Sequence, residues 1–245
     1  MRVLPGTPLP PSLTPQLQGD KRPDRRDRAT IRIVTFNDDF TDKKTDLPRV
    51  HGGVVMVQEA KNVNVHGAVN QRRYDVFQNR EDDAHAGSAL YWKHDRFRVT
   101  GRGQQLLAKA DGNDDMLDRH ITWSDLKVRG KDVNVRMASA HRPPGDEKDE
   151  WAEFDRGLVQ FAKQARRDGI PVVIGMDINM RDPKRIRELE RKTGLEWHRP
   201  PGSIDGFLTS PNIRFNVKPH REKDRFSEGH SPVAASITVF ESRSR

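Results

Sequence analysis

Short apolar runs, separated by charged, glycine-containing or proline-containing segments, recur along the chain from residue 31 onward. Ile31-Arg-Ile-Val-Thr-Phe-Asn37 is β-rich, and Val54-Val-Met-Val-Gln-Glu59 is continuous enough to predict a strand covered on both faces. The same signal predicts further strands over 87–92, 97–100, 121–128, 133–139, 172–177, 203–208 and 231–239. We expect the first two of these to pair through a short charged turn, and the next two to form a hairpin.

Over residues 147–168 the spacing of apolar residues changes to that of an amphipathic helix. Apolar side chains recur there every three or four positions, at Trp151, Phe154, Leu158, Phe161 and Ala165. Gly169 and Pro171 end this helix, and a second, polar helix is predicted around 183–193. Because there is no internal repeat and no later linker, we predict one mixed α/β domain over 31–240, followed by a tail at 241–245.

Residues 1–30 are predicted to be a disordered leader. They are rich in proline and then in charge, so neither part can bury apolar surface. Their basic side chains have two possible roles, either following phosphates along a nucleic acid or only keeping the chain soluble; they are Arg22, Arg25, Arg26 and Arg28.

The chain of 245 residues is basic, with a net charge of +8 at pH 7 and a pI near 9.9. This balance favours an anionic partner, nucleic acid first and an anionic membrane surface second. Cysteine is absent, which excludes disulfides, thiolate metal sites and cysteine nucleophiles. No apolar run is long enough for a membrane helix and no secretory signal is recognisable, so we expect a soluble, cytoplasmic protein.

A polar pair closes the apolar run Ile174-Gly-Met-Asp177-Ile-Asn179. If the segment stays extended, side chains at i and i+2 point to the same face, and a carboxylate and an amide project together. Such a carboxylate can bind a metal or accept a proton, and the amide can position a phosphoryl oxygen. Asp and Asn also end strands simply as turn formers, so the pair gains meaning only from its neighbours.

Other predicted strands carry residues of the same chemical kind: Asn37, Glu59 and His141 close strands, Asp205 lies inside a later strand, and His230 immediately precedes the last one. In α/β sheets, sites collect at strand ends, where loops meet over a rigid platform. Each residue alone has an ordinary explanation, as a turn former or a solvated histidine. Their coincidence at so many strand ends favours a phosphate or metal site.

Six short motifs occur in a fixed order, and they are Thr35-Phe-Asn37, Gln58-Glu59, Ser139-Ala-His141, Gly175-Met-Asp177-Ile-Asn179, Ile204-Asp205-Gly-Phe-Leu and Ser227-Glu-Gly-His230-Ser-Pro-Val. This order resembles that of the endonuclease/exonuclease/phosphatase superfamily, which includes the deoxyribonuclease-I-like phosphodiesterases. The resemblance spans about residues 31–239. It implies an α/β (α+β) four-layer sandwich, in which two mixed β-sheets face each other and are flanked by helices.

The resemblance also implies a divalent metal, Mg²⁺ or Mn²⁺. Glu59 resembles the principal metal ligand, Asn37 the amide beside the metal, and Asp39 an additional carboxylate of some nuclease members. A hard cation with oxygen ligands suits phosphoryl transfer because it neutralises charge on the phosphate.

Four residues resemble the groups that handle the proton and the phosphate. Asp177 resembles the residue that orients or deprotonates the attacking water, and Asn179 the one that holds the phosphoryl group. His230 resembles the histidine that contacts the phosphate and assists proton movement. Asp205 is then the residue that fixes the tautomer of this histidine and raises its basicity.

Three positions match the family pattern less closely. His141 resembles a second phosphate-side histidine, which some branches replace, and Arg119 precedes a strand where many members place a basic residue. The family usually reads Ser-Asp-His before its final strand, whereas Gly229 here precedes His230. Either the metal site relies on the other ligands, or activity is impaired.

The leading interpretation is a metal-dependent phosphodiesterase that hydrolyses nucleic acid, with DNA favoured over RNA, and that acts as a monomer without a membrane partner. One alternative is a phosphatase or phosphodiesterase for a small phosphoester, such as an inositol phosphate, a nucleotide or a lipid head group. The other is a catalytically impaired nucleic-acid-binding relative, degenerate at Gly229.

Overall fold

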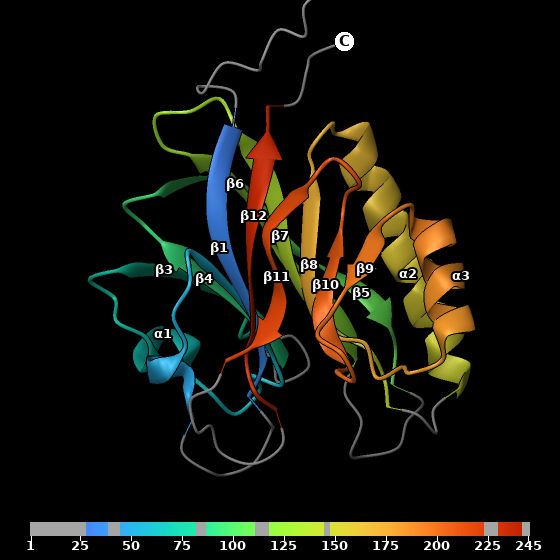
Figure 1. Cartoon of the computed structure of the whole chain (residues 1–245). Coiled ribbons are helices and arrows are strands. Elements are labelled where there is room, and N and C mark those ends of the chain that lie inside the picture. The colour runs from blue at the N-terminus through green and yellow to red at the C-terminus, as the bar shows by residue number, and fades with distance from the viewer. Residues whose placement is uncertain are drawn as a thin grey trace, which may run out of the picture.

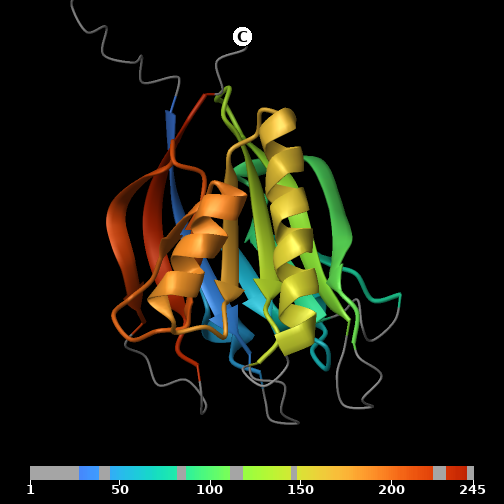
Figure 2. The same ribbon diagram turned by 90° about the vertical axis from the view of Figure 1, so that its right-hand side faces the viewer.

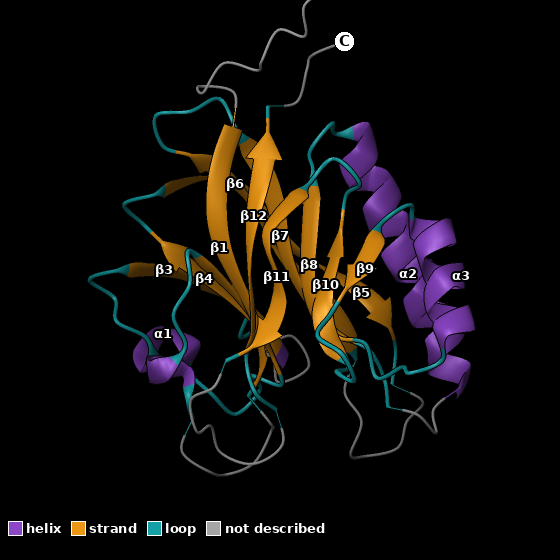
Figure 3. Cartoon of the chain, in the orientation of Figure 1, coloured by secondary structure: helices purple, strands orange, loops and turns teal. Residues whose placement is uncertain are grey.

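The computed structural model describes residues 28–38, 45–81, 87–110, 118–144, 148–222 and 230–241. Two mixed β-sheets of six strands each pack face to face (Figure 1), so the predicted two-sheet sandwich is confirmed. Strands make up most of the ordered structure, and the helices lie outside the sheets (Figure 3). Within the described ranges, no helix is long and apolar enough to cross a membrane.

The first sheet contains β1 (Arg28–Asn37), β2 (Val54–Gln58), β3 (Tyr74–Gln78), β4 (Ser88–Lys93), β11 (Arg214–Arg221) and β12 (Val233–Phe240). Their order is β11-β12-β1-β2-β4-β3, and only β1 and β2 pair in parallel. Two short elements pack on its outer face, the 3-10 helix η2 (Leu47–Arg49) and α1 (Val65–Ala68). All positions of β2 are buried because this strand has the second sheet on one side and these elements on the other.

The second sheet contains β5 (Phe97–Ala108), β6 (Arg119–Val128), β7 (Asn134–His141), β8 (Val172–Asp177), β9 (Glu196–His198) and β10 (Asp205–Thr209). Their order is β5-β6-β7-β8-β10-β9, with β7 and β8 parallel. Two longer helices cover its outer face (Figure 2), α2 (Lys148–Arg167) and α3 (Pro183–Thr193).

Both predicted helices are confirmed, and local sequence explains where α3 begins and ends. The side chain of Asp182 accepts a hydrogen bond from the backbone N–H of Lys184, and Pro183 occupies the first turn, where no N–H is needed. Gly194 ends the helix in the left-handed region, with φ of 68°.

One predicted pairing is wrong, that of 87–92 with 97–100. β4 pairs with β2 and β3 in the first sheet, whereas β5 pairs with β6 in the second. The turn between them passes from one sheet to the other, because Trp92 and Phe97 both pack in the core between the sheets. The predicted hairpin is confirmed, since β6 and β7 are antiparallel neighbours. Elements missed by the sequence pattern are β3, β9, β11 and α1.

Candidate active site

The polar strand ends predicted from the sequence meet at one edge of the sandwich. Asp177, the last residue of β8, lies opposite His141 of β7 in the parallel register and opposite Asp205 of β10 in the antiparallel register. Asn37 ends β1 on the facing sheet, and Glu59 directly follows β2. The site therefore draws side chains from both sheets.

The amide of Asn37 joins the two halves of this cluster. Its Nδ2 atom donates to Oε1 of Glu59 at 2.9 Å and to Oδ2 of Asp177 at 3.3 Å. Asn37 and Asp177 are almost fully buried, whereas the Glu59 carboxylate keeps 24% of its side-chain surface exposed. A substrate or an ion can therefore reach Glu59 more readily than the two residues behind it.

A buried polar layer beneath the cluster holds the sheets together. The Nε2 atom of Gln58 donates to Oγ of Ser139 at 2.8 Å and to the carbonyl of Gly175 at 3.2 Å, while Thr35 donates its hydroxyl proton to Oε1 of Gln58 at 3.1 Å. Buried polar groups are stable only when bonded in this way. The polar members Thr35, Gln58 and Ser139 each interrupt an apolar run, but their positions alone predict no role for them.

Two residues of the cluster have left-handed backbone conformations, Glu59 with φ of 53° and Asn179 with φ of 44°. This region is uncommon for residues other than glycine and recurs at functional sites. The expected extended geometry of Asp177 and Asn179 is wrong, because β8 ends at Asp177. The backbone N–H of Asn179 instead donates to Oδ1 of Asp177 at 2.8 Å, which closes an Asx turn.

The side chain of Asn179 turns toward the end of β7. Its Nδ2 atom donates to the carbonyl of Arg142 at 2.8 Å and lies 3.0 Å from Nε2 of His141. The same Nε2 atom lies 3.5 Å from Oε1 of Glu59 and 3.7 Å from Oδ2 of Asp177. His141 is thus in contact with both the water-side and the phosphate-side residues predicted from the sequence.

Burial lowers the pKa of His141 well below its ordinary value of 6.5, and the positive charges of Arg119 and His230 lower it further. The ring is therefore neutral at pH 7. Both ring nitrogens face donors, because Nη1 of Arg119 lies 3.3 Å from Nδ1 and the amide Nδ2 of Asn179 lies 3.0 Å from Nε2. A neutral ring can accept a hydrogen bond from only one of these two groups.

Burial also raises the pKa of Asp177, to about 6, and the neighbouring charge of Asp205 adds to this effect. The backbone N–H of Asn179, the charge of His230 and the amide of Asn37 act in the opposite direction. A carboxyl group whose pKa lies near neutrality is suited to accepting a proton from water.

His230 and Asp205 form a pair beside Asp177. The Nδ1 atom of His230 lies 3.1 and 3.0 Å from the two carboxylate oxygens of Asp205, and Nε2 lies 3.9 Å from Oδ2 of Asp177. The hydrogen bond to Asp205 raises the pKa of His230 to about 9, against the lowering effect of burial. His230 is therefore protonated at pH 7, with Nδ1–H bonded to Asp205 and Nε2–H directed toward Asp177.

Two groups of side chains in this cluster have the donors of a cation site. Asp177, Asp205 and His230 each place one donor atom within 4.8 Å of the others. Both oxygens of Asp205 are already bonded to the histidine, however. Glu59 instead offers a partly exposed carboxylate, which is the kind of donor that a hard cation prefers, and the amide of Asn37 lies beside it with Nδ2 facing the carboxylate. Asp39 and Gly229, named in the sequence analysis, lie outside the described residues.

Comparisons with known proteins support the fold. No family model matches the sequence, and no curated protein sequence matches it. An endonuclease/exonuclease/phosphatase family protein from Bacteroides thetaiotaomicron has a TM-score of 0.62 at 17% identity, over 86% of this chain and 98% of that one. The mannosyl-6-phosphatase Bt3783 of the same organism has a TM-score of 0.61 at 17% identity, over 84% and 99%.

A third structure, of D. rerio TDP2 complexed with a single-strand DNA product, has a TM-score of 0.59 at 13% identity, over 85% of this chain and 99% of that one. All three matches cover nearly the whole of the known chain. The protein therefore has the fold of the endonuclease/exonuclease/phosphatase superfamily, and the resemblance predicted from the sequence is confirmed for the fold.

Proposed function

We propose that this protein is a divalent-metal-dependent phosphodiesterase that hydrolyses nucleic acid. The observation that carries the proposal is the convergence of Asn37 and Glu59 from one sheet with His141, Asp177 and Asp205 from the other. Carboxylates, an amide and histidines at one rigid edge provide oxygen ligands, a base and donors for a phosphate.

Glu59 and Asn37 would hold the cation, which is Mg²⁺ or Mn²⁺, with Asp39 as a further carboxylate. Their oxygens fit a hard cation, and the Glu59 carboxylate is open to solvent. When bound, the cation neutralises negative charge on the phosphate. The left-handed backbone at Glu59 turns its side chain out of the strand direction, toward Asn37.

Asp177 and His230 would move the protons. Asp177 orients the attacking water and accepts its proton, since its carboxylate is buried and held by Asn37 and by the Asx turn. His230 carries its Nε2 proton toward the same place and donates it to a phosphate oxygen or to the leaving group. Asp205 fixes the orientation of the histidine ring.

Asn179, His141 and Arg119 would hold the phosphoryl oxygens. The amide of Asn179 lies beside Nε2 of His141, and burial together with the charge of Arg119 behind the ring keeps His141 neutral. A neutral donor holds a phosphate oxygen without competing with the cation for charge.

Nucleic acid is favoured as substrate because the chain is basic, with a net charge of +8. The TDP2 structure with a single-strand DNA product shows this fold holding a nucleic acid. A small phosphoester is the second candidate, because the mannosyl-6-phosphatase Bt3783 has the same fold at similar TM-score.

A substrate panel distinguishes the two candidates. The purified full chain is incubated with single-stranded DNA, duplex DNA, RNA, mannose 6-phosphate and an inositol phosphate, each with Mg²⁺, Mn²⁺ or a chelator. We expect cleavage of nucleic acid that requires the metal and is lost in Glu59→Gln, but not in Glu196→Gln, an exposed carboxylate on the far end of the second sheet. Turnover of the sugar or inositol phosphate alone would assign the second function, and no turnover of any substrate would refute both.

A further inference from the structure

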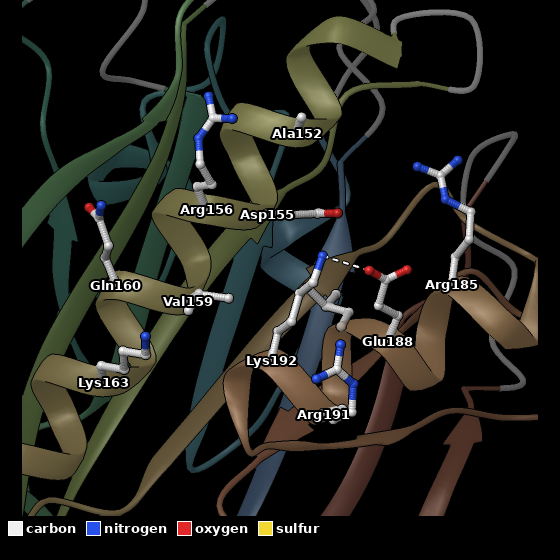
Figure 4. Close-up of a pocket in the computed structure, with 11 residues that line it drawn as sticks. Ala152, Asp155, Arg156, Val159, Gln160, Lys163, Arg185, Glu188, Arg191 and Lys192 are labelled. Atoms are coloured by element: carbon white, nitrogen blue, oxygen red, sulfur yellow. Dashed lines mark ion pairs between the residues drawn. The ribbon is translucent and has the colours of Figure 1, made fainter.

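A basic groove lies between α2 and α3 on the outer face of the second sheet (Figure 4). It has a volume of about 790 Å³ and is separate from the cluster of strand ends. Five basic side chains line it, Arg156 and Lys163 from α2 and Arg185, Arg191 and Lys192 from α3. The groove is therefore a strongly positive feature that the proposed hydrolytic site does not use.

The two acidic residues of the groove are already engaged. Asp155 bonds Nε of Arg142 at 3.2 Å, and Glu188 bonds Nζ of Lys192 at 2.6 Å. Over the part of the chain that the structure describes, Arg156, Lys163 and Arg191 take part in no ion pair. These three cations border the groove (Figure 4), and of them Arg191 also interacts electrostatically with Glu188, so an anionic ligand would meet little competition at Arg156 and Lys163.

The chemistry of the lining indicates a phosphate backbone rather than bases. No aromatic side chain lines the groove, so there is no platform on which bases could stack. Arg156 and Lys163 are seven residues apart on one helix, which separates them by about 10 Å along the axis. One strand of a B-form duplex advances about 3.4 Å per phosphate along the axis, and an extended single strand advances more, so this length spans about two to three phosphates.

An ion pair with the buried Arg142 links the groove to the proposed active site. Asp155 in its wall pairs with the side chain of Arg142, and the carbonyl of Arg142 accepts the hydrogen bond from Asn179. The indole of Trp151 lies between two guanidinium groups, with Arg142 4.4 Å and Arg185 4.1 Å from its ring centroid. One end of the groove is therefore a single residue away from the side chains that would hold the scissile phosphate.

We infer that the groove between α2 and α3 binds the sugar-phosphate backbone of a nucleic acid strand that extends beyond the hydrolytic site. This inference rests on the proposed function, which places another part of the same strand in the hydrolytic site. The contacts are to phosphates, so the groove is indifferent to sequence and its binding is sensitive to salt.

Binding is measured in the presence of a chelator, which prevents metal-dependent cleavage. The probe is a fluorescent oligonucleotide of about 30 nucleotides, prepared as single-stranded DNA, as RNA and as a duplex. The groove variant carries Arg156→Gln, Lys163→Gln and Arg191→Gln. A matched control removes the same charge from exposed positions beside and on the first sheet, through Arg72→Gln and Arg73→Gln in the turn before β3 and Lys218→Gln on β11. Circular dichroism and thermal unfolding confirm that both variants are folded.

We expect the groove variant to bind at least about tenfold more weakly near 0.1 M salt, because each lost phosphate contact removes counterion release. The slope of log affinity against log salt should become shallower by about two for single strands. The control should stay within about twofold of the wild type. Equal weakening in the two variants, or unchanged affinity and slope in the groove variant, would overturn the inference.

Kinetics separate failure of this inference from failure of the proposed function. If the protein is a nuclease, the groove variant should raise KM for the long oligonucleotide at least about tenfold more than KM for a dinucleotide. Metal-dependent cleavage with an unchanged ratio of these KM values would refute the groove and keep the nuclease. If the groove variant loses binding and the wild type hydrolyses no substrate, the groove is supported and the proposed nuclease function is refuted.

Discussion

Gly175 lies where β8 packs closely against the facing sheet, two residues before Asp177 of the proposed site. A Cβ atom at this position would lie 2.8 Å from Cβ of Met56, 2.8 Å from Oγ1 of Thr35 and 2.9 Å from Sδ of Met56. The carbonyl of Gly175 also accepts from Gln58. The change Gly175→Ala therefore forces the sheets apart where the buried polar layer joins them.

The free energy of unfolding should fall by about 2–4 kcal/mol in Gly175→Ala. Overpacking a core by one methyl group costs about 1–3 kcal/mol, and the upper part of this range applies because Cβ of Met56 cannot rotate away. Weakening the hydrogen bond from Gln58 adds about 1 kcal/mol. For a chain of this size the melting temperature should drop by about 5–15 °C.

Chemical and thermal denaturation measure this effect, with Gly87→Ala as the matched control. A Cβ at Gly87 meets nothing within 4 Å, so that variant should stay within about 0.5 kcal/mol of the wild type. Asp177 lies two residues beyond Gly175 in the chain, so hydrolysis should also slow in Gly175→Ala. If Gly175→Ala were as stable as Gly87→Ala, the sheets would not be packed as described.

Three further predictions concern side chains around the site. In metal-free protein, NMR titration should give His230 a pKa of about 9, and this pKa should fall in Asp205→Asn. The stability that protonated His230 contributes is fully present below about pH 6.5 and is lost as the pH rises through about 9. An unchanged pKa of His230 in the variant would refute the pairing of His230 with Asp205. Asn179→Gly should keep wild-type stability, since glycine accepts the left-handed backbone, but lose most activity, whereas full activity would exclude the amide from the mechanism. Asp155→Asn should destabilise the fold by about 2–4 kcal/mol in denaturation experiments, because the fully buried Arg142 loses its carboxylate partner, and a neutral effect would contradict that burial.

The parts of the site that the sequence predicted are the polar residues that end apolar runs. Asn37, Glu59, Asp177 and Asp205 stand at strand boundaries, and the strand ends of a sheet lie close together once the sheet forms. The helix α2 was predictable for a similar reason, because its apolar period is determined by the single face that it buries.

Features that depend on tertiary packing could not be predicted in this way. The strand at 97–108 joins the second sheet although Phe97 packs in the same core as Trp92 of the first sheet, and no local signal records which sheet a strand enters. β11 is mostly exposed at a sheet edge, so it has no apolar alternation to detect. The left-handed turn at Asn179 and the groove between α2 and α3 likewise arise from the assembled structure.

The most direct test of the proposed function is the rate at which the purified full chain cleaves a labelled oligonucleotide, with saturating Mg²⁺ or Mn²⁺, compared with Glu59→Gln and Asp177→Asn. These changes keep the size of each side chain and remove the charge that would hold the cation or accept the proton. We expect metal-dependent cleavage by the wild type and a loss of at least about a hundredfold in each variant. Cleavage that persists in chelator, or that is unchanged in both variants, would contradict the proposed site.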